Sequence, residues 1–70
     1  MISQRLDELV RDMVEKGVQF EDAVHEFEKR YIARVLGTSE GSLTRAADTL
    51  GIHRNTLSRK MTEYRIKKRA

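Results

Sequence analysis

The stretch Ser42–Tyr64, with the sequence SLTRAADTLGIHRNTLSRKMTEY, decides the fold of this chain. Apolar residues recur at helical spacing on both sides of Gly51, while proline is absent. This pattern predicts two short helices, over residues 42–50 and from about 53 to about 64, joined by a tight turn at the glycine.

The residues around the predicted turn suit two helices that cross at close range. Ala46 and Ala47 are small enough to let the second helix approach. Gly51 tolerates the positive φ that such a turn requires, Ile52 can fill the corner, and Leu57 can anchor the second helix against the first. The pattern is typical of a helix-turn-helix, whose second helix lies in the major groove of DNA.

The remaining residues of the stretch are polar or basic and are expected to face outward. Arg54 suits guanine and Asn55 suits adenine, because each can form paired hydrogen bonds with that base edge. Hydroxyls, lysines and a helix N-terminus more often contact phosphate. Ser42 or Thr44 can cap the first helix. For His53, the alternatives to DNA proximity are capping of the second helix and exposure to solvent. The expected DNA-contacting residues are Ser42, Thr44, Arg45, His53, Arg54, Asn55, Thr56, Ser58, Arg59 and Lys60.

The charges divide the chain into an acidic and a basic part. Residues 1–40 carry 6 Lys/Arg against 9 Asp/Glu, a net of −3, whereas residues 41–70 carry 8 against 2, a net of +6. A basic half suits DNA, whose phosphates release counterions when cationic side chains bind. The basic tail over residues 65–69 is expected to add attraction that does not depend on base sequence.

Two longer helices are predicted before the stretch, over residues 3–16 and 19–36. Ser3 is expected to cap the first, Gly17 to end it and Gly37 to end the second. Each helix carries an apolar stripe, and together the stripes exceed what a monomer normally exposes, so we expect a homodimer. The expected interface residues are Leu6, Leu9, Val10, Met13, Phe20, Val24, Phe27 and Tyr31.

The composition restricts the chain to one all-α domain, with a two-helix dimerisation region over 1–37 and a DNA-binding region over 38–70. There is no cysteine, and His25 lies in HEFEK rather than HExxH, so no metal or cofactor is expected. No apolar run approaches the ~20 residues of a membrane span, and the N-terminus lacks the apolar region of a signal peptide. We expect a cytoplasmic, nucleoid-associated protein and, since its carboxylates have no pocket to serve, not an enzyme.

The run TRAADTLGIHRNTLSRKMTEY resembles the C-terminal helix-turn-helix of the Fis family, shared by a nucleoid protein and the NtrC-type enhancer-binding activators. The matching elements are TRAA over 44–47, LGI over 50–52, RNTL over 54–57 and RK over 59–60. The match is tight over 41–64 and loose, as helix pattern only, over 3–37. The resemblance implies four helices per subunit, with the first two building an intertwined dimer.

The same resemblance implies roles for individual residues. It implies that Arg54 reads a base edge, with guanine as the expected base, and that His53 lies near the bases. The residues that it places on the DNA backbone are Thr44, Arg45, Thr56, Arg59 and Lys60.

A second hypothesis comes from the apolar stripes. They also suit a helical dimerisation or adaptor module whose basic half binds a protein partner or an anionic surface. Within the DNA-binding hypothesis, two settings remain open. In the first, the chain is a free-standing transcriptional regulator or nucleoid protein. In the second, it is the C-terminal part of an activator with an ATPase or receiver domain upstream, or a descendant of such an activator that lost its ATPase.

Overall fold

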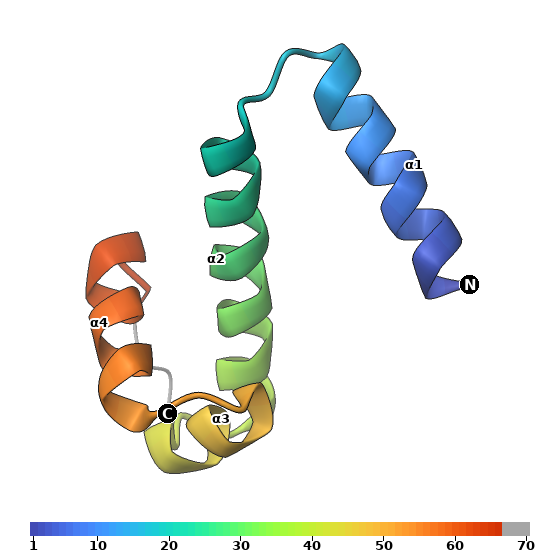
Figure 1. Ribbon diagram of the computed structural model, residues 1–70. Helices are drawn as coiled ribbons and strands as arrows, with labels where there is room; N and C mark the ends of the chain where they lie inside the picture. The colour runs from blue at the N-terminus through green and yellow to red at the C-terminus, as the bar shows by residue number, and fades with distance from the viewer. Residues whose placement is uncertain (67–70) are drawn as a thin grey trace.

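The computed structural model describes residues 1–66, which form four α-helices and no strand (Figure 1). The helices are α1 (Ile2–Glu15), α2 (Phe20–Thr38), α3 (Leu43–Leu50) and α4 (Arg54–Tyr64). The predicted all-α fold class is confirmed. Residues 67–69 of the basic tail lie outside the described residues. None of the helices within 1–66 combines the length and hydropathy needed to cross a lipid bilayer.

The apolar core lies where the C-terminal half of α2 meets α3 and α4. Leu36 of α2 and Leu57 of α4 are its largest fully buried side chains. The buried apolar residues are Ile32, Val35, Leu36, Ala46, Ala47, Leu57 and Met61, and those packed around them are Leu43, Leu50, Ile52, Tyr64 and Ile66. Because burial of apolar surface is the main stabilising contribution, the helix-turn-helix is held against α2.

The turn between α3 and α4 has the geometry that its residues predict. Gly51 ends α3 with a left-handed φ of 73°. The Ile52 amide donates a hydrogen bond to the Ala47 carbonyl over 3.1 Å, the long backbone bond of a Schellman motif. Ala46 and Leu57 have no exposed surface, which confirms their assignment to the helix crossing.

Two of the predicted helix ends are wrong. Ser3 does not cap α1, which begins at Ile2 with Met1 in the cap position and no side-chain cap. Gly37 does not end α2, which continues to Thr38. The chain leaves the helix instead at Glu40 and Gly41, with φ values of 55° and 78°, because a helix cannot propagate through two successive left-handed residues. Gly17, with a φ of 77°, does follow the end of α1 as predicted.

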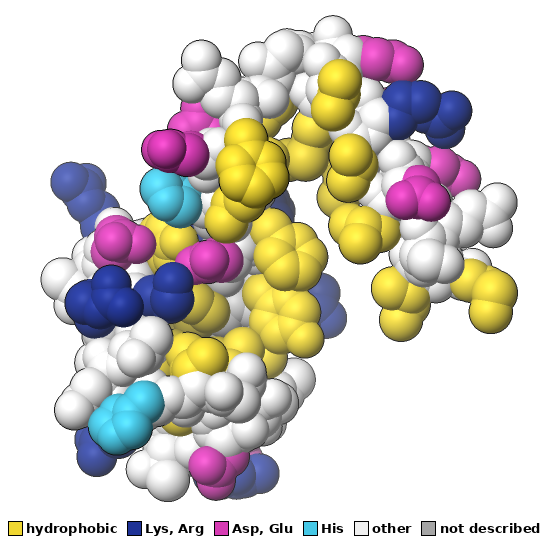
Figure 2. Space-filling model, viewed as in Figure 1, with side chains coloured by type: hydrophobic (Ala, Val, Ile, Leu, Met, Phe, Trp, Pro, Cys, Tyr) yellow, Lys and Arg dark blue, Asp and Glu magenta, His cyan; other side chains and the backbone are white. Residues whose placement is uncertain are grey.

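The N-terminal half of the molecule is open. Figure 1 shows that α1 is joined to α2 by a loop at one end and diverges from it toward the N-terminus. α1 contains no buried residue. Apolar side chains line the facing sides of α1 and α2 (Figure 2). Leu6, Leu9 and Val10 on α1 and Phe20, Phe27 and Tyr31 on α2 are exposed, and Met13 and Val24 are partly buried. A single chain thus leaves most of this apolar surface uncovered.

Candidate nucleic-acid interface

The N-terminus of α3 is capped by Ser42 rather than by Thr44. The Ser42 hydroxyl accepts a hydrogen bond from the Arg45 amide over 3.3 Å. Thr44 and Arg45 are exposed in the first turn. The Arg45 guanidinium lies 3.6 Å from Glu40 in an exposed ion pair, and such a pair contributes little free energy. Arg45 therefore remains available to an anionic partner.

The N-terminus of α4 presents three polar side chains. His53 is its cap residue, with Nδ1 accepting a hydrogen bond from the Asn55 amide over 3.1 Å. In the structure, His53 thus caps the N-terminus of α4. His53, Arg54 and Asn55 are all exposed, as the outward-facing interpretation of this segment requires.

The rest of the outer surface of α4 is polar and exposed. Ser58, Arg59 and Thr62 are exposed, while Thr56 is half-buried. Within residues 1–66, neither Arg54 nor Arg59 takes part in an ion pair. On α4, which the core anchors at Leu57 and Met61, two exposed guanidinium groups therefore have no ion-pair partner among residues 1–66.

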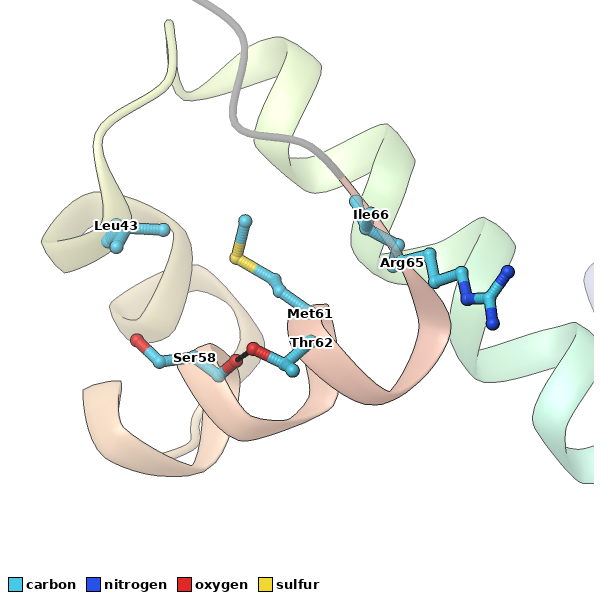
Figure 3. Close-up of a pocket in the computed structure, with 6 residues that line it drawn as sticks. All are labelled: Leu43, Ser58, Met61, Thr62, Arg65 and Ile66. Atoms are coloured by element: carbon cyan, nitrogen blue, oxygen red, sulfur yellow. Dashed lines mark hydrogen bonds between the residues drawn. The ribbon is translucent and has the colours of Figure 1, made fainter.

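An open hollow of about 330 Å³ lies between α3 and the C-terminal part of α4. Its lining residues are Leu43, Ser58, Met61, Thr62, Arg65 and Ile66. In Figure 3 the Met61 side chain lies between Leu43 and Ile66, whereas the Arg65 guanidinium is directed away from them. The Thr62 hydroxyl donates a hydrogen bond to the Ser58 carbonyl over 3.2 Å. Because Ser58 lines this hollow together with Leu43, it lies on the flank of α4 next to α3.

Lys60 lies on another flank, facing α2. Its ammonium donates a hydrogen bond to Glu28 Oε1 over 2.7 Å, and the Tyr64 hydroxyl donates to the same oxygen over 2.7 Å. The Lys60 and Glu28 side chains are only 25% and 32% exposed. Among the predicted DNA-contacting residues, Lys60 thus differs in being tied to another helix.

The environment of the Glu28 carboxylate shifts two pKa values. The hydrogen bonds from Lys60 and then Tyr64 lower the pKa of Glu28 below its usual value of 4.5. Burial, followed by the bond to Glu28, raises the pKa of Tyr64 to about 12. The carboxylate is therefore charged and the phenol neutral at physiological pH.

Sequence reasoning did not find the roles of Glu28 and Tyr64. Glu28 precedes Lys60 by 32 positions and Tyr64 by 36, so no local pattern connects them. His25, one turn before Glu28, packs edge-on against Tyr64 with ring centroids 5.6 Å apart. Within the described residues, no group of three His, Cys, Asp or Glu side chains is arranged to hold a metal ion.

The comparisons with known proteins agree with this geometry. The family described as "Bacterial regulatory protein, Fis family" matches residues 23–64, which include most of α2 and all of α3 and α4. A protein of Xylella fastidiosa (strain 9a5c), described as Fis-like and DNA-binding, is 49% identical over 41 residues. The match covers 59% of this chain but only 46% of that relative's length. No solved structure matches the chain. Through its helix-turn-helix and the helix that supports it, the chain belongs to the Fis family of bacterial regulatory proteins.

Proposed function

We propose that the chain is a sequence-selective, dimeric DNA-binding regulator that inserts α4 into the major groove. The observation that carries the proposal is the exposed start of α4. Arg54 and Asn55 are exposed in the first turn of a helix whose following turns, at Leu57 and Met61, are buried in the core. A rigidly held helix with polar side chains at its leading end is what readout of base edges requires.

The residue types divide the proposed contacts into two kinds. Arg54 pairs with guanine O6 and N7, and Asn55 with adenine N6 and N7, while His53 lies near the bases and caps the helix. The phosphate contacts come from both helices of the motif and fix its register. The residues assigned to them are Ser42, Thr44, Arg45, Thr56, Ser58 and Arg59.

The exposed apolar surface of α1 and α2 supports dimerisation. Phe27 and Tyr31 are each 53% exposed, with their rings packed together at a centroid distance of 5.5 Å. A second copy of the chain is the partner that suits this surface, because the same stripes on both subunits would cover one another in a two-fold interface. Family membership gives the same expectation. The DNA-binding description of the Xylella fastidiosa relative agrees with the proposed role.

A dimer of this kind presents two copies of α4. In undistorted DNA, two helices that enter successive major grooves on one side lie about 34 Å apart. The resemblance to the Fis family implies a shorter separation and a bent duplex, so flexible central base steps should strengthen binding.

The test joins oligomeric state to DNA affinity. Val10 is 48% exposed in the single chain, so Val10→Asp can remove the dimer without damaging the core. We expect this variant to sediment as a monomer and to bind duplex DNA at least ~100-fold more weakly, since the second half-site no longer adds avidity. Gln4→Asp is the matched control, because it adds the same charge on the side of α1 that faces away from the apolar stripe and should change neither quantity.

Two results would count against the proposal. A Val10→Asp variant that stays dimeric with intact affinity rules out the interface. Failure of the unaltered chain to bind duplex DNA, at low salt as well as high, rules out the DNA-binding role and favours the adaptor hypothesis.

A further inference from the structure

Three side chains form a polar clamp between α2 and α4, defined by Glu28, Lys60 and Tyr64. One oxygen of the Glu28 carboxylate accepts hydrogen bonds from Lys60 and Tyr64, both over 2.7 Å. Lys60 and Tyr64 are four residues apart and therefore lie on the same side of α4. Two donors from one helix thus converge on a single acceptor of another.

The clamp lies toward the end of α4 that is distant from the turn. α4 runs antiparallel to α2 (Figure 1), so the clamp joins the later part of α4 to Glu28, beside the apolar contacts that Leu57, Met61 and Tyr64 make with the core. Apolar contacts are not directional, so by themselves they constrain the tilt of α4 on the core only weakly. Because the clamp adds two directional hydrogen bonds to these contacts, it restricts the angle between α4 and α2.

The angle between α4 and α2 affects DNA recognition because α2 both contributes to the core and bears part of the apolar surface assigned to the dimer. We propose that Glu28 is a positioning residue for DNA recognition, which acts through Lys60 and Tyr64 to hold α4 at a fixed angle to α2 and thereby sets the half-site spacing that the dimer accepts. The inference rests on the proposed function, since it presupposes two copies of α4 on one duplex. It also gives Lys60 a role other than the phosphate contact implied by the family resemblance.

The environment of Lys60 supports that reassignment. Its ammonium is in a short, partly buried ion pair, whereas Arg59, the next residue, is exposed and outside any ion pair of residues 1–66. Contact with a phosphate would require Lys60 to leave the partly buried Glu28 carboxylate, which would lose its counter-charge and keep only the hydrogen bond from Tyr64. Arg59 needs no such exchange, which makes the two adjacent cations a matched pair for an experiment.

The experiment compares Lys60→Met with Arg59→Met in the full chain. Affinity is measured against salt concentration, on duplexes whose two half-sites are moved apart one base pair at a time. Arg59→Met should lower the slope of log affinity against log salt by about 0.9, the value for one lost phosphate contact, and leave the preferred spacing unchanged. Lys60→Met should leave the slope unchanged and reduce discrimination between spacings by about three- to tenfold, as expected when two contacting side chains are uncoupled.

Two further variants test the clamp without removing Lys60. Tyr64→Phe keeps every charge and should reduce spacing discrimination with an unchanged salt slope. Glu28→Gln should also reduce spacing discrimination. It should steepen the slope of log affinity against log salt by up to about 0.9, because Lys60 is then released to reach phosphate. Circular dichroism of each variant verifies that the helices are retained, so a change in spacing preference is not a loss of fold.

The outcomes separate this inference from the proposed function. If Lys60→Met lowers the salt slope as Arg59→Met does and all clamp variants keep the spacing preference, the clamp role is overturned while DNA binding stands. If the unaltered chain binds duplexes of every spacing equally, the positioning role is likewise overturned. If it binds no duplex, both proposals are overturned together.

Discussion

At the scale of single residues, Gly51 and Gly37 show that a glycine ends a helix only where its φ is positive. Gly51 has a φ of 73° and ends α3, whereas Gly37 has no positive φ and lies within α2. An added Cβ would meet no atom within 4 Å at either position. The two sites thus differ in backbone conformation and not in available space.

Replacement by alanine should therefore have opposite effects at the two glycines. Gly37→Ala should stabilise the protein by about 0.5–1 kcal/mol, since alanine loses less entropy than glycine in a helix. Gly51→Ala should destabilise it by about 1–2 kcal/mol, the cost of a left-handed conformation for a residue with a Cβ. Urea unfolding of both variants gives the two free energies, and equal signs would contradict the assignment of conformational strain to Gly51 alone.

Single residues also show what the sequence could and could not predict. Ala46, Leu57 and the Gly51 turn were predictable, because the motif is local and its small, apolar and flexible residues have fixed spacing. The helix end predicted at Gly37 was wrong, because the residues with left-handed φ are Glu40 and Gly41, beyond the end of α2.

At the scale of elements, α2 performs two tasks along its length. Its C-terminal half buries Ile32, Val35 and Leu36 in the core, while its N-terminal half leaves Phe20 and Phe27 exposed. The helical periodicity of α2 predicted the apolar stripe. The partner of Glu28 could not be predicted in the same way, because a contact between residues 32 positions apart depends on how α4 folds back along α2.

The clamp between α2 and α4 predicts a pH dependence of stability. The pKa of Glu28 is lowered below 4.5, so its stabilising contribution is complete above pH 4.5 and is lost as the pH falls through the lowered value. The pKa of Tyr64 is raised from 10.0 to about 12, so the contribution of the neutral phenol is complete below pH 10 and is lost as the pH rises toward 12.

Urea unfolding across this pH range can isolate the Glu28 contribution. At neutral pH, Glu28→Gln should be less stable than the unaltered chain by an amount of the order of 1 kcal/mol, since the group is partly solvated. This difference should shrink on acidification below pH 4.5. A difference that stays constant through the acidic range would show that the charge of Glu28 does not stabilise the fold.

At the scale of the whole molecule, the acidic and basic parts have separate tasks in the proposed function. The part over residues 1–40 has a net charge of −3 and bears the apolar surface assigned to the dimer, whereas the part over 41–70 has a net charge of +6 and contains α3 and α4. The repulsion between a negative surface and DNA would favour approach through α3 and α4. Charge and periodicity were readable from the sequence, whereas the angle between the two parts depends on packing.

The most direct test of base readout by α4 is a selection of bound duplexes from a random pool, performed with the unaltered chain and with Arg54→Ala. Arg11→Ala, which removes the same charge from α1, is the control. The unaltered chain and the control should enrich two half-sites with a shared guanine in each. Arg54→Ala should lose preference at that guanine, with a cost of about 1–3 kcal/mol on the selected site. Enrichment of the same guanine by Arg54→Ala, or equal weakening on all sequences, would contradict the reading of DNA by the exposed start of α4.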